Sequence, residues 1–182
     1  AESSGRPLVC DASSDILSRP MDVSQHALIY AGAQKNLGPA GVTLVIVRRD
    51  LLGDAPSNIP TLLDYQIHAD KDSRYNTPPV FPMYMVGLVL EWIKKKGGLA
   101  AVSRLNRMKA DLLYRAIDGT DFYQGHAVSD SRSLMNVPFR TPSAEIDALF
   151  IKEAASEGFV NLKGHRSVGG CRASIYNAMS IE

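Results

Sequence analysis

Residues 30–41, with the sequence YAGAQKNLGPAG, place a single lysine among small residues, directly after an apolar run. The amine of such a lysine, Lys35, is a nucleophile that can condense with a carbonyl group. A lysine without special neighbours is usually a solvated surface residue whose charge lies in water. The segments that precede Lys35 favour the chemical role.

Two short apolar segments are expected to form buried strands of an α/β sheet, residues 7–10 and residues 27–31. Asp11 follows the first segment and Lys35 follows the second, so if the strands are neighbours both would lie at the sheet edge where ligands bind. This pair is typical of pyridoxal phosphate (PLP) chemistry, in which a lysine forms a Schiff base and a carboxylate keeps the pyridine nitrogen protonated. Alternatively, Asp11 is a turn or cap residue beside Ser13 and Ser14, and spacing alone does not decide between these interpretations.

Longer stretches of the chain resemble one enzyme family. Residues 10–20 (CDASSDILSRP), 29–36 (IYAGAQKN), 74–79 (RYNTPP) and 164–174 (GHRSVGGCRAS) closely resemble the phosphoserine aminotransferases. These belong to the class V aminotransferase group of fold-type I PLP enzymes, and the resemblance covers essentially the whole chain. It implies an α/β fold, in which part of the large-domain sheet of a PLP-dependent aminotransferase is followed by a small α+β C-terminal domain.

The resemblance also assigns cofactor roles. It implies that Lys35 and Asp11 are catalytic, and that Gln34 lies beside the cofactor phosphate as a donor. Asn76 and Thr77 would contact the same phosphate from the partner subunit of a homodimer with shared active sites. Without the resemblance, these two residues would be ordinary turn residues before a proline.

Three further residues are implied to bind substrate. Arg172 would hold the α-carboxylate, while His165 and Arg166 would meet the substrate phosphate from the neighbouring subunit. Arginine suits both anions because its planar guanidinium pairs with them through two hydrogen bonds. The implied reaction transfers the amino group of L-glutamate to 3-phosphohydroxypyruvate and gives O-phospho-L-serine and 2-oxoglutarate. Without the resemblance, these three residues would be interpreted as solvated loop residues.

The length of the chain raises a further expectation. Members of this family are about twice as long as these 182 residues and carry the cofactor lysine past their midpoint, whereas Lys35 lies near the start and no initiator Met is present. We therefore expect the C-terminal half of the enzyme, with the N-terminal half as a required partner and little activity in isolation.

Composition is that of an ordinary soluble protein, with 45% hydrophobic and 21% charged residues and a formal net charge of +1. No apolar run is long enough to cross a bilayer, and no signal peptide is recognisable. The basic run Lys94 to Lys96 is expected to close a helix rather than to bind nucleic acid. Cys10 and Cys171 lack the spacing of a metal site or a redox pair, so both are expected to be reduced thiols in a cytoplasmic protein.

Hydrophobic periodicity predicts a domain boundary near Lys96, which gives residues 1–96 as the cofactor-binding part and 97–182 as the small domain. Residues 53–82 are rich in proline and are expected to form an extended loop. A helix entry is predicted at Thr141 and Pro142. Expected strands are 7–10, 27–31, 42–47, 134–137, 159–162 and 173–176; expected helices are 83–96, 99–113 and 141–155. The expected core face of the second helix is formed by Leu99, Val102, Leu105, Met108, Leu112 and Leu113.

Two other functions remain open. The chain could be a non-catalytic dimerisation module that retains the site residues without the chemistry. It could also be another PLP enzyme such as a cysteine desulfurase, but that function requires a mobile catalytic cysteine and leaves His165 and Arg166 unexplained.

Overall fold

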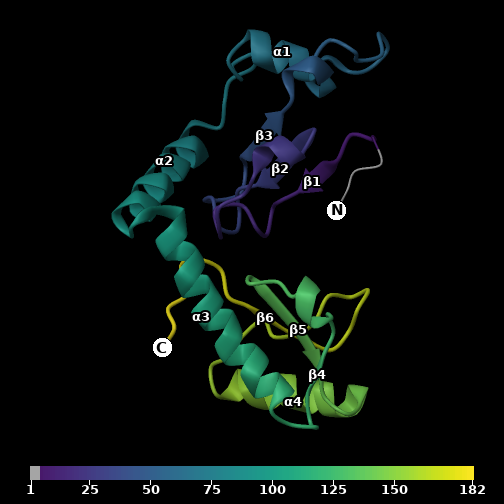
Figure 1. The fold of residues 1–182 in the computed structure, drawn as a ribbon, viewed down its shortest axis with the longest axis vertical. Coiled ribbons are helices and arrows are strands. Elements are labelled where there is room, and N and C mark those ends of the chain that lie inside the picture. The colour runs from purple at the N-terminus through teal and green to yellow at the C-terminus, as the bar shows by residue number, and fades with distance from the viewer. Residues whose placement is uncertain (1–4) are drawn as a thin grey trace. The chain divides into compact units, whose positions relative to one another are not determined.

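The structure is a computed structural model that describes residues 5–182, and its mixed α/β fold confirms the predicted fold class (Figure 1). The chain divides into two compact units, one ending at Lys95 and the other beginning at Lys96. The assignment of these units to the large and small domains of an aminotransferase stays a prediction. Each unit has its own sheet and its own core.

The sheet of the first unit has the order β1-β2-β3, formed by β1 (Val9–Asp11), β2 (Leu28–Gly32) and β3 (Thr43–Val47). All three strands were predicted from apolar runs. β1 and β2 are parallel, with Asp11 opposite Tyr30, while β3 runs antiparallel to β2. Because β1 and β2 are parallel, their carboxyl ends lie at the same edge of the sheet.

The core of this unit lies on one side of β2 and beneath the loops that leave the strands. Its buried side chains are Ala12, Ile16, Ile29, Ala31, Ala33 and Leu37. The prediction that the first strand is buried is wrong, since Val9 is 58% exposed. β1 pairs with a single neighbour, so in this chain it is an edge strand with only Cys10 turned partly inward.

Two short helices, η3 (Thr61–Leu63) and α1 (Tyr65–Asp70), lie in the segment expected to be an extended loop. Two others precede it, η1 (Val23–Gln25) and η2 (Arg49–Leu51). The prediction missed α1, which begins where the Asp64 carboxylate accepts a hydrogen bond from the backbone N–H of Gln66, at 2.9 Å. This capping bond is worth about 1 kcal/mol and starts a helix too short to show a periodic pattern.

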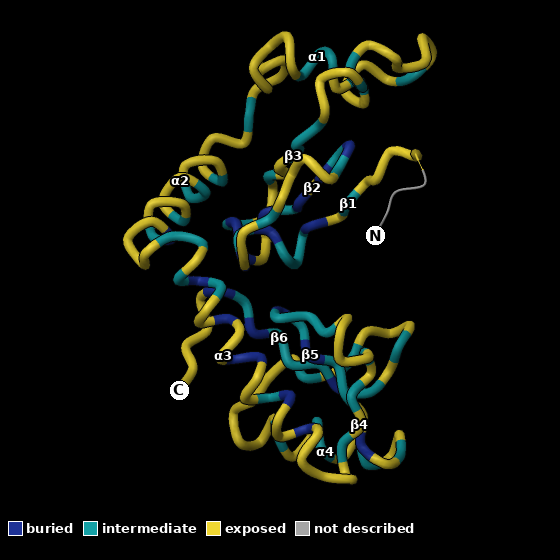
Figure 2. Tube along the Cα trace, viewed as in Figure 1, coloured by how far each residue is buried: buried dark blue, intermediate teal, exposed yellow. Residues whose placement is uncertain are grey.

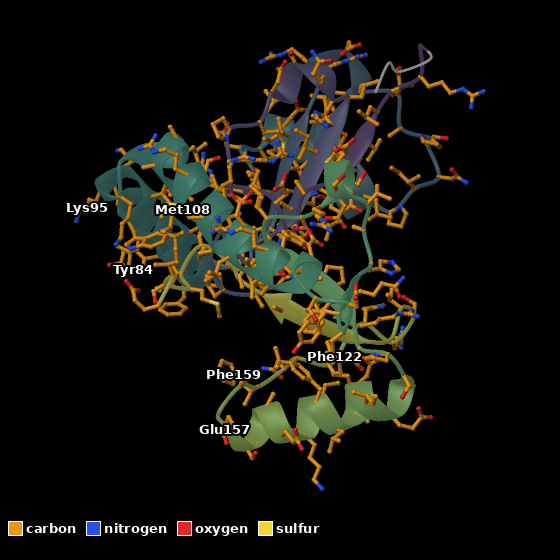
Figure 3. All side chains as sticks on the ribbon, turned by 60° about the horizontal axis from the view of Figure 1, so that its bottom comes forward. Tyr84, Lys95, Met108, Phe122, Glu157 and Phe159 are labelled. Carbon is orange, nitrogen blue, oxygen red and sulfur yellow. The ribbon has the colours of Figure 1, made fainter. Side chains whose placement is uncertain are left out.

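The predicted long helix is confirmed as α2 (Val80–Lys95), although it starts before the expected residue 83. Lys94 and Lys95 lie in its last turn, where cations complement the helix dipole. Val86 packs against Gly38 of the loop after β2, where an added Cβ would come within 3.0 Å of the valine side chain. Figure 2 shows most of α2 exposed, and the exposed ring of Tyr84 is labelled in Figure 3.

The second unit packs helices against an antiparallel sheet of order β4-β5-β6. Its elements are α3 (Gly98–Asp118), β4 (Gln124–Gly125), η4 (Ser129–Ser131), β5 (Asn136–Arg140), α4 (Ala144–Ser156) and β6 (Cys171–Ser174). Residues 159–162 form no strand, so that prediction is wrong; only Lys163 makes an isolated bridge, to Cys171. The helix predicted from Pro142 begins instead at Ala144, because Ser143 caps the N–H of Ile146.

The buried face of α3 differs from the predicted one. Leu105, Met108 and Leu112 were expected in the core but are exposed, as Figure 3 illustrates for Met108. The buried residues of α3 are Val102, Asn106, Lys109, Ala110, Tyr114 and Ile117. Two positions of this buried face, Asn106 and Lys109, are polar, so the pattern of apolar residues does not follow the buried face.

Within residues 5–182, no helix is both long enough and apolar enough to cross a membrane. The same residues contain no group of three His, Cys, Asp or Glu side chains placed to hold a metal ion. Cys10 and Cys171 are both free thiols.

Candidate active site

Asp11 is the last residue of β1, and its exposed carboxylate is held by the segment that follows. The backbone N–H of Ser13 donates to Oδ1 of Asp11 at 2.9 Å. Hydrogen bonds from the Ser13 hydroxyl and backbone hold the pKa of the Asp11 carboxyl below its ordinary value of 3.8, and the charge of Lys35 adds to this effect. Asp11 is therefore ionised at neutral pH. Its negative charge in turn raises the pKa of Tyr30, its neighbour on β2.

Lys35 lies on the loop after β2, and the structure brings it to the segment that follows Asp11. Its Nζ donates to the hydroxyl of Ser14 at 2.5 Å. The buried amide of Asn36 reaches the same segment, where its Nδ2 donates to the carbonyls of Ser14 at 3.3 Å and Ile16 at 3.2 Å. These bonds fix the lysine loop against the aspartate loop. The predicted pair of Asp11 and Lys35 thus occupies one edge of one sheet.

Three residues of this arrangement were missed as functional residues from the sequence. Ser13 accepts a hydrogen bond from the N–H of Gly32 at 3.0 Å, which joins the two strand ends directly. Ser14 and Asn36 make the contacts to the lysine loop. The sequence offered only the pair of serines after Asp11, which indicates a turn as readily as a site.

Gln34 is exposed next to Lys35 and folds back toward the end of β2. A Cβ added to Gly32 would lie 2.5 Å from Oε1 of Gln34, closer than real Cβ contacts allow. Glycine at position 32 therefore leaves the space into which the Gln34 amide folds.

Asn76 and Thr77 lie in the exposed stretch before α2. Nδ2 of Asn76 donates to the carbonyl of Thr77 at 3.2 Å, which is an ordinary turn contact. Neither residue is hydrogen-bonded to Asp11 in the described part of the chain. Their predicted role in a partner subunit's site stays a prediction.

Arg172 lies on β6 in the second unit, where it stands opposite Pro138 of β5. Its backbone N–H donates to the carbonyl of Leu162 at 2.7 Å. Its guanidinium Nε is buried, and no atom of residues 5–182 accepts a hydrogen bond from it. A buried donor without an acceptor is costly, and a bound carboxylate would satisfy it.

His165 and Arg166 are exposed on the loop that leads into β6. The loop is closed by a hydrogen bond from the N–H of Gly164 to the carbonyl of Gly170, at 2.8 Å. Two side chains that can donate to an anion are therefore displayed on a loop with fixed ends. Their assignment to a substrate phosphate stays a prediction.

The two sets of residues fit different parts of one chemistry. The first unit offers an ionised carboxylate beside an amine, which suits a group with a basic ring nitrogen and an aldehyde. The second unit offers a half-buried guanidinium whose Nε has no acceptor within residues 5–182, together with exposed cationic or neutral donors, which suit carboxylate and phosphate groups.

Comparison with known proteins identifies the family, because all of residues 1–182 match the family described as aminotransferase class-V. The chain belongs to the class-V aminotransferases.

Relatives of this class-V aminotransferase chain include a phosphoserine aminotransferase from Geobacillus kaustophilus, 61% identical over 176 residues that cover 96% of the chain and 49% of the relative. The solved phosphoserine aminotransferase of Bacillus circulans subsp. alkalophilus has a TM-score of 0.92 and 56% identity, covering 98% of the chain and 50% of that structure. A PLP-bound phosphoserine aminotransferase from Trichomonas vaginalis has a TM-score of 0.92 and 39% identity, covering 100% and 52%. The predicted family is confirmed.

The class-V chain spans about half the length of the curated relatives it matches, 49% of the relatives from Ectopseudomonas mendocina and Geobacillus kaustophilus. The expectation that this is the C-terminal half is withdrawn, because the matches give a share of the relatives' length and do not support that placement.

Proposed function

We propose that the chain is part of a phosphoserine aminotransferase that transfers the amino group of L-glutamate to 3-phosphohydroxypyruvate. The observation that carries the proposal is the pairing of an ionised Asp11 with Lys35 at the ends of two parallel strands, in a chain of this family. The other half of the enzyme is a required partner. The proposed assembly is a cytoplasmic homodimer with shared active sites.

PLP is the proposed cofactor, because the relative from Trichomonas vaginalis is PLP-bound and the residues at the strand ends fit its ring and aldehyde. When bound, this cofactor supplies an electron-withdrawing ring that stabilises negative charge at the substrate α-carbon. Asp11 would keep the pyridine nitrogen protonated, which its lowered pKa permits because the carboxylate stays ionised. Gln34 would donate its amide to the cofactor phosphate, joined by Asn76 and Thr77 of the partner subunit.

Lys35 has two proposed tasks. Its amine would hold the cofactor covalently, and once displaced by the amino group of glutamate it would carry a proton from the substrate α-carbon. Ser14 is placed to receive the free amine, since its hydroxyl already accepts a hydrogen bond from Nζ.

Substrate binding is proposed for the second unit. Arg172 would hold the α-carboxylate, and the unpaired Nε supports this role because it lacks any other acceptor. His165 and Arg166 would bind the phosphate of the phosphorylated substrate. The phosphorylated keto acid would place its carboxylate and its phosphate on these two sets of donors, whereas glutamate offers a second carboxylate in place of the phosphate.

A cysteine desulfurase is disfavoured by the placement of the thiols. Cys10 lies within β1 and Cys171 is fully buried in β6, whereas that reaction needs a cysteine on a mobile segment. The alternative of a non-catalytic module is left to experiment.

The test is covalent trapping of the cofactor. The chain, produced together with the other half of the enzyme, is incubated with PLP and reduced with borohydride, and the labelled peptide is located by mass spectrometry. We expect the label on Lys35, its loss in Lys35→Ala, and its retention in Lys71→Ala, which removes an exposed lysine after α1. No label with both halves present would favour the non-catalytic module, and a label on another lysine would refute the assignment.

A further inference from the structure

The loop formed by residues 164–170 is rigidly constructed. The carbonyl of His165 accepts hydrogen bonds from the N–H groups of Val168 at 2.9 Å and Gly169 at 2.8 Å. A Cβ at Gly164 would lie only 2.0 Å from the carbonyl oxygen of Gly169, so the loop closes to a distance that only glycine allows. The guanidinium of Arg140 on β5 also donates to the carbonyl of Val168.

Within this loop the imidazole of His165 makes two contacts to one residue. Its Nδ1 lies 2.7 Å from the hydroxyl oxygen of Ser167 and 3.3 Å from the backbone nitrogen of Ser167. A hydroxyl can either donate or accept, so the first contact alone leaves the tautomer open. A backbone N–H can only donate, and the second contact therefore makes Nδ1 an acceptor.

The consequence is a defined tautomer. If Nδ1 accepts from the N–H, its lone pair is directed at Ser167, the hydroxyl donates to the same atom, and the ring proton is on Nε2. A hydrogen on Nδ1 would instead oppose the backbone N–H of Ser167. No hydrogen bond to Nε2 of the exposed His165 is found within residues 5–182, so this N–H is available to a ligand.

We propose that Ser167 is a positioning residue that holds His165 as the Nε2–H tautomer, so that the loop presents a fixed N–H donor to the substrate phosphate. The proposal rests on the proposed function for the identity of the anion, whereas the tautomer itself follows from the contacts of the loop. It gives Ser167 a role that no other contact of its side chain explains. A neutral donor fixed before binding costs less entropy to use than a freely turning ring.

The first test is nuclear magnetic resonance of the chain with ¹⁵N-labelled histidine at about pH 8, more than one unit above the ordinary histidine pKa of about 6.5. His165 is assigned by comparison with His165→Gln. We expect its two-bond ring couplings to show the neutral Nε2–H form. Ser167→Ala should give a mixture of tautomers, because it keeps only the longer backbone contact of 3.3 Å and loses the hydroxyl at 2.7 Å, and Ser167→Thr should restore the original pattern because it keeps the hydroxyl. An Nδ1–H pattern in the unmodified chain would overturn the proposal, as would an unchanged pattern in Ser167→Ala.

The second test separates this inference from the proposed function. In the assembled enzyme, Ser167→Ala is expected to raise KM for the phosphorylated keto acid about three- to tenfold, the size of one ordinary hydrogen bond, and KM for glutamate, which carries no phosphate, by less. Ser131→Ala removes an exposed serine of the same unit and should change neither value. Equal effects on both substrates would overturn the positioning role. If the tautomer is as proposed but His165→Gln leaves KM for the phosphorylated substrate unchanged, the proposed phosphate role of His165 fails while the tautomer assignment stands.

Discussion

Lys109 is the most constrained charge in the second unit, and its replacement by methionine gives a quantitative test of the fold. It lies on α3, is only 4% exposed, and its Nζ donates to the carbonyls of Ile175 at 3.1 Å, Tyr176 at 2.9 Å and Met179 at 3.0 Å. Burial lowers the pKa of Lys109, whereas three carbonyl acceptors favour the ammonium, because only that form has three N–H donors. We therefore expect a charged lysine that fastens the tail after β6 to α3.

The cost of Lys109→Met can be estimated from these contacts. The contact to Ile175 is fully buried, and an acceptor left without a donor there costs about 2 kcal/mol. The contacts to Tyr176 and Met179 are partly buried, so water can replace the lost donor in part and each costs about 1 kcal/mol. Methionine no longer buries a charge, which offsets about 1 kcal/mol. The net loss in the free energy of unfolding is about 3 kcal/mol.

The assay is urea denaturation followed by hydrogen exchange, which reports on each unit separately. For a loss of about 3 kcal/mol, the midpoint for the second unit falls by roughly 1 to 2 M. The amide of Ile175, which donates to the carbonyl of Met135 at 2.9 Å, should lose protection. Fluorescence of Trp92, the single tryptophan, reports on α2 of the first unit and should not change.

The matched control is Arg107→Met, which removes an exposed cation from the same helix and should change stability by less than about 0.5 kcal/mol. If Lys109→Met were no less stable than this control, the three carbonyl contacts would contribute nothing net, and the description of Lys109 as a fastening charge would be refuted.

Two other changes test the thiols and the carboxylate. Burial raises the pKa of the Cys171 thiol from 9.0 to about 11, so iodoacetamide at neutral pH should label Cys10 first and Cys171 only on unfolding. The pKa of Cys171 is higher in the folded than in the unfolded protein, so the contribution of this thiol to stability is complete below about pH 9 and is lost as the pH rises toward about 11. Denaturation midpoints should therefore fall over this pH range, and Cys171→Ala should make the fall smaller. Asp11→Asn in the assembled enzyme should slow amino transfer by about 10² to 10³-fold, the typical cost of removing a preorganised electrostatic contact. The control Asp22→Asn, at the exposed N-cap of η1, should leave the rate unchanged. Equal rates for the two variants would contradict the role of Asp11.

Helices and strands were predicted correctly where apolar residues form a continuous run or a clear period. Strands β2 and β3 are runs of aliphatic residues, and α2 is long enough to show its period, so all three were found from the sequence. The sequence could not indicate α1, since six residues give too little periodicity, nor could it show that β3 is antiparallel to β2. Whether two neighbouring strands are parallel or antiparallel depends on the path of the loop that joins them, and the pattern of apolar residues does not specify that path.

The prediction of the buried face of α3 was wrong for a different reason. Its buried stripe includes Lys109 and Asn106, whose hydrogen-bond partners lie in the tail after β6. For example, Nδ2 of Asn106 donates to the side-chain oxygen of Asn177 at 2.8 Å. A search for apolar residues therefore selected Leu105, Met108 and Leu112 on the neighbouring face. Burial of polar groups depends on acceptors that are distant in sequence, and only the structure brings them together.

In the candidate site too, some residues could be predicted from local sequence patterns, while others depend on contacts that only the structure shows. Lys35 and Asp11 could be found because they follow apolar strands, and strand ends in α/β folds are where ligands bind. Ser14 and Ser167 could not, because each acts through a contact that depends on a particular loop conformation. Residue types identify the chemistry, whereas the supporting residues appear only with geometry.

The separation of the site residues into two units leads to a final consequence for how variants should behave. Asp11 and Lys35 are fixed by hydrogen bonds within the first unit, and Arg172 and the loop containing His165 are fixed by bonds within the second. Each set therefore has hydrogen bonds within its own unit that help to position it. Substitutions at the first set should alter cofactor attachment and the rate of the chemical step, while those at the second should alter the affinity for substrate anions. Ser167→Ala and Asp11→Asn would then show additive effects when combined, because residues that share no partners contribute independently.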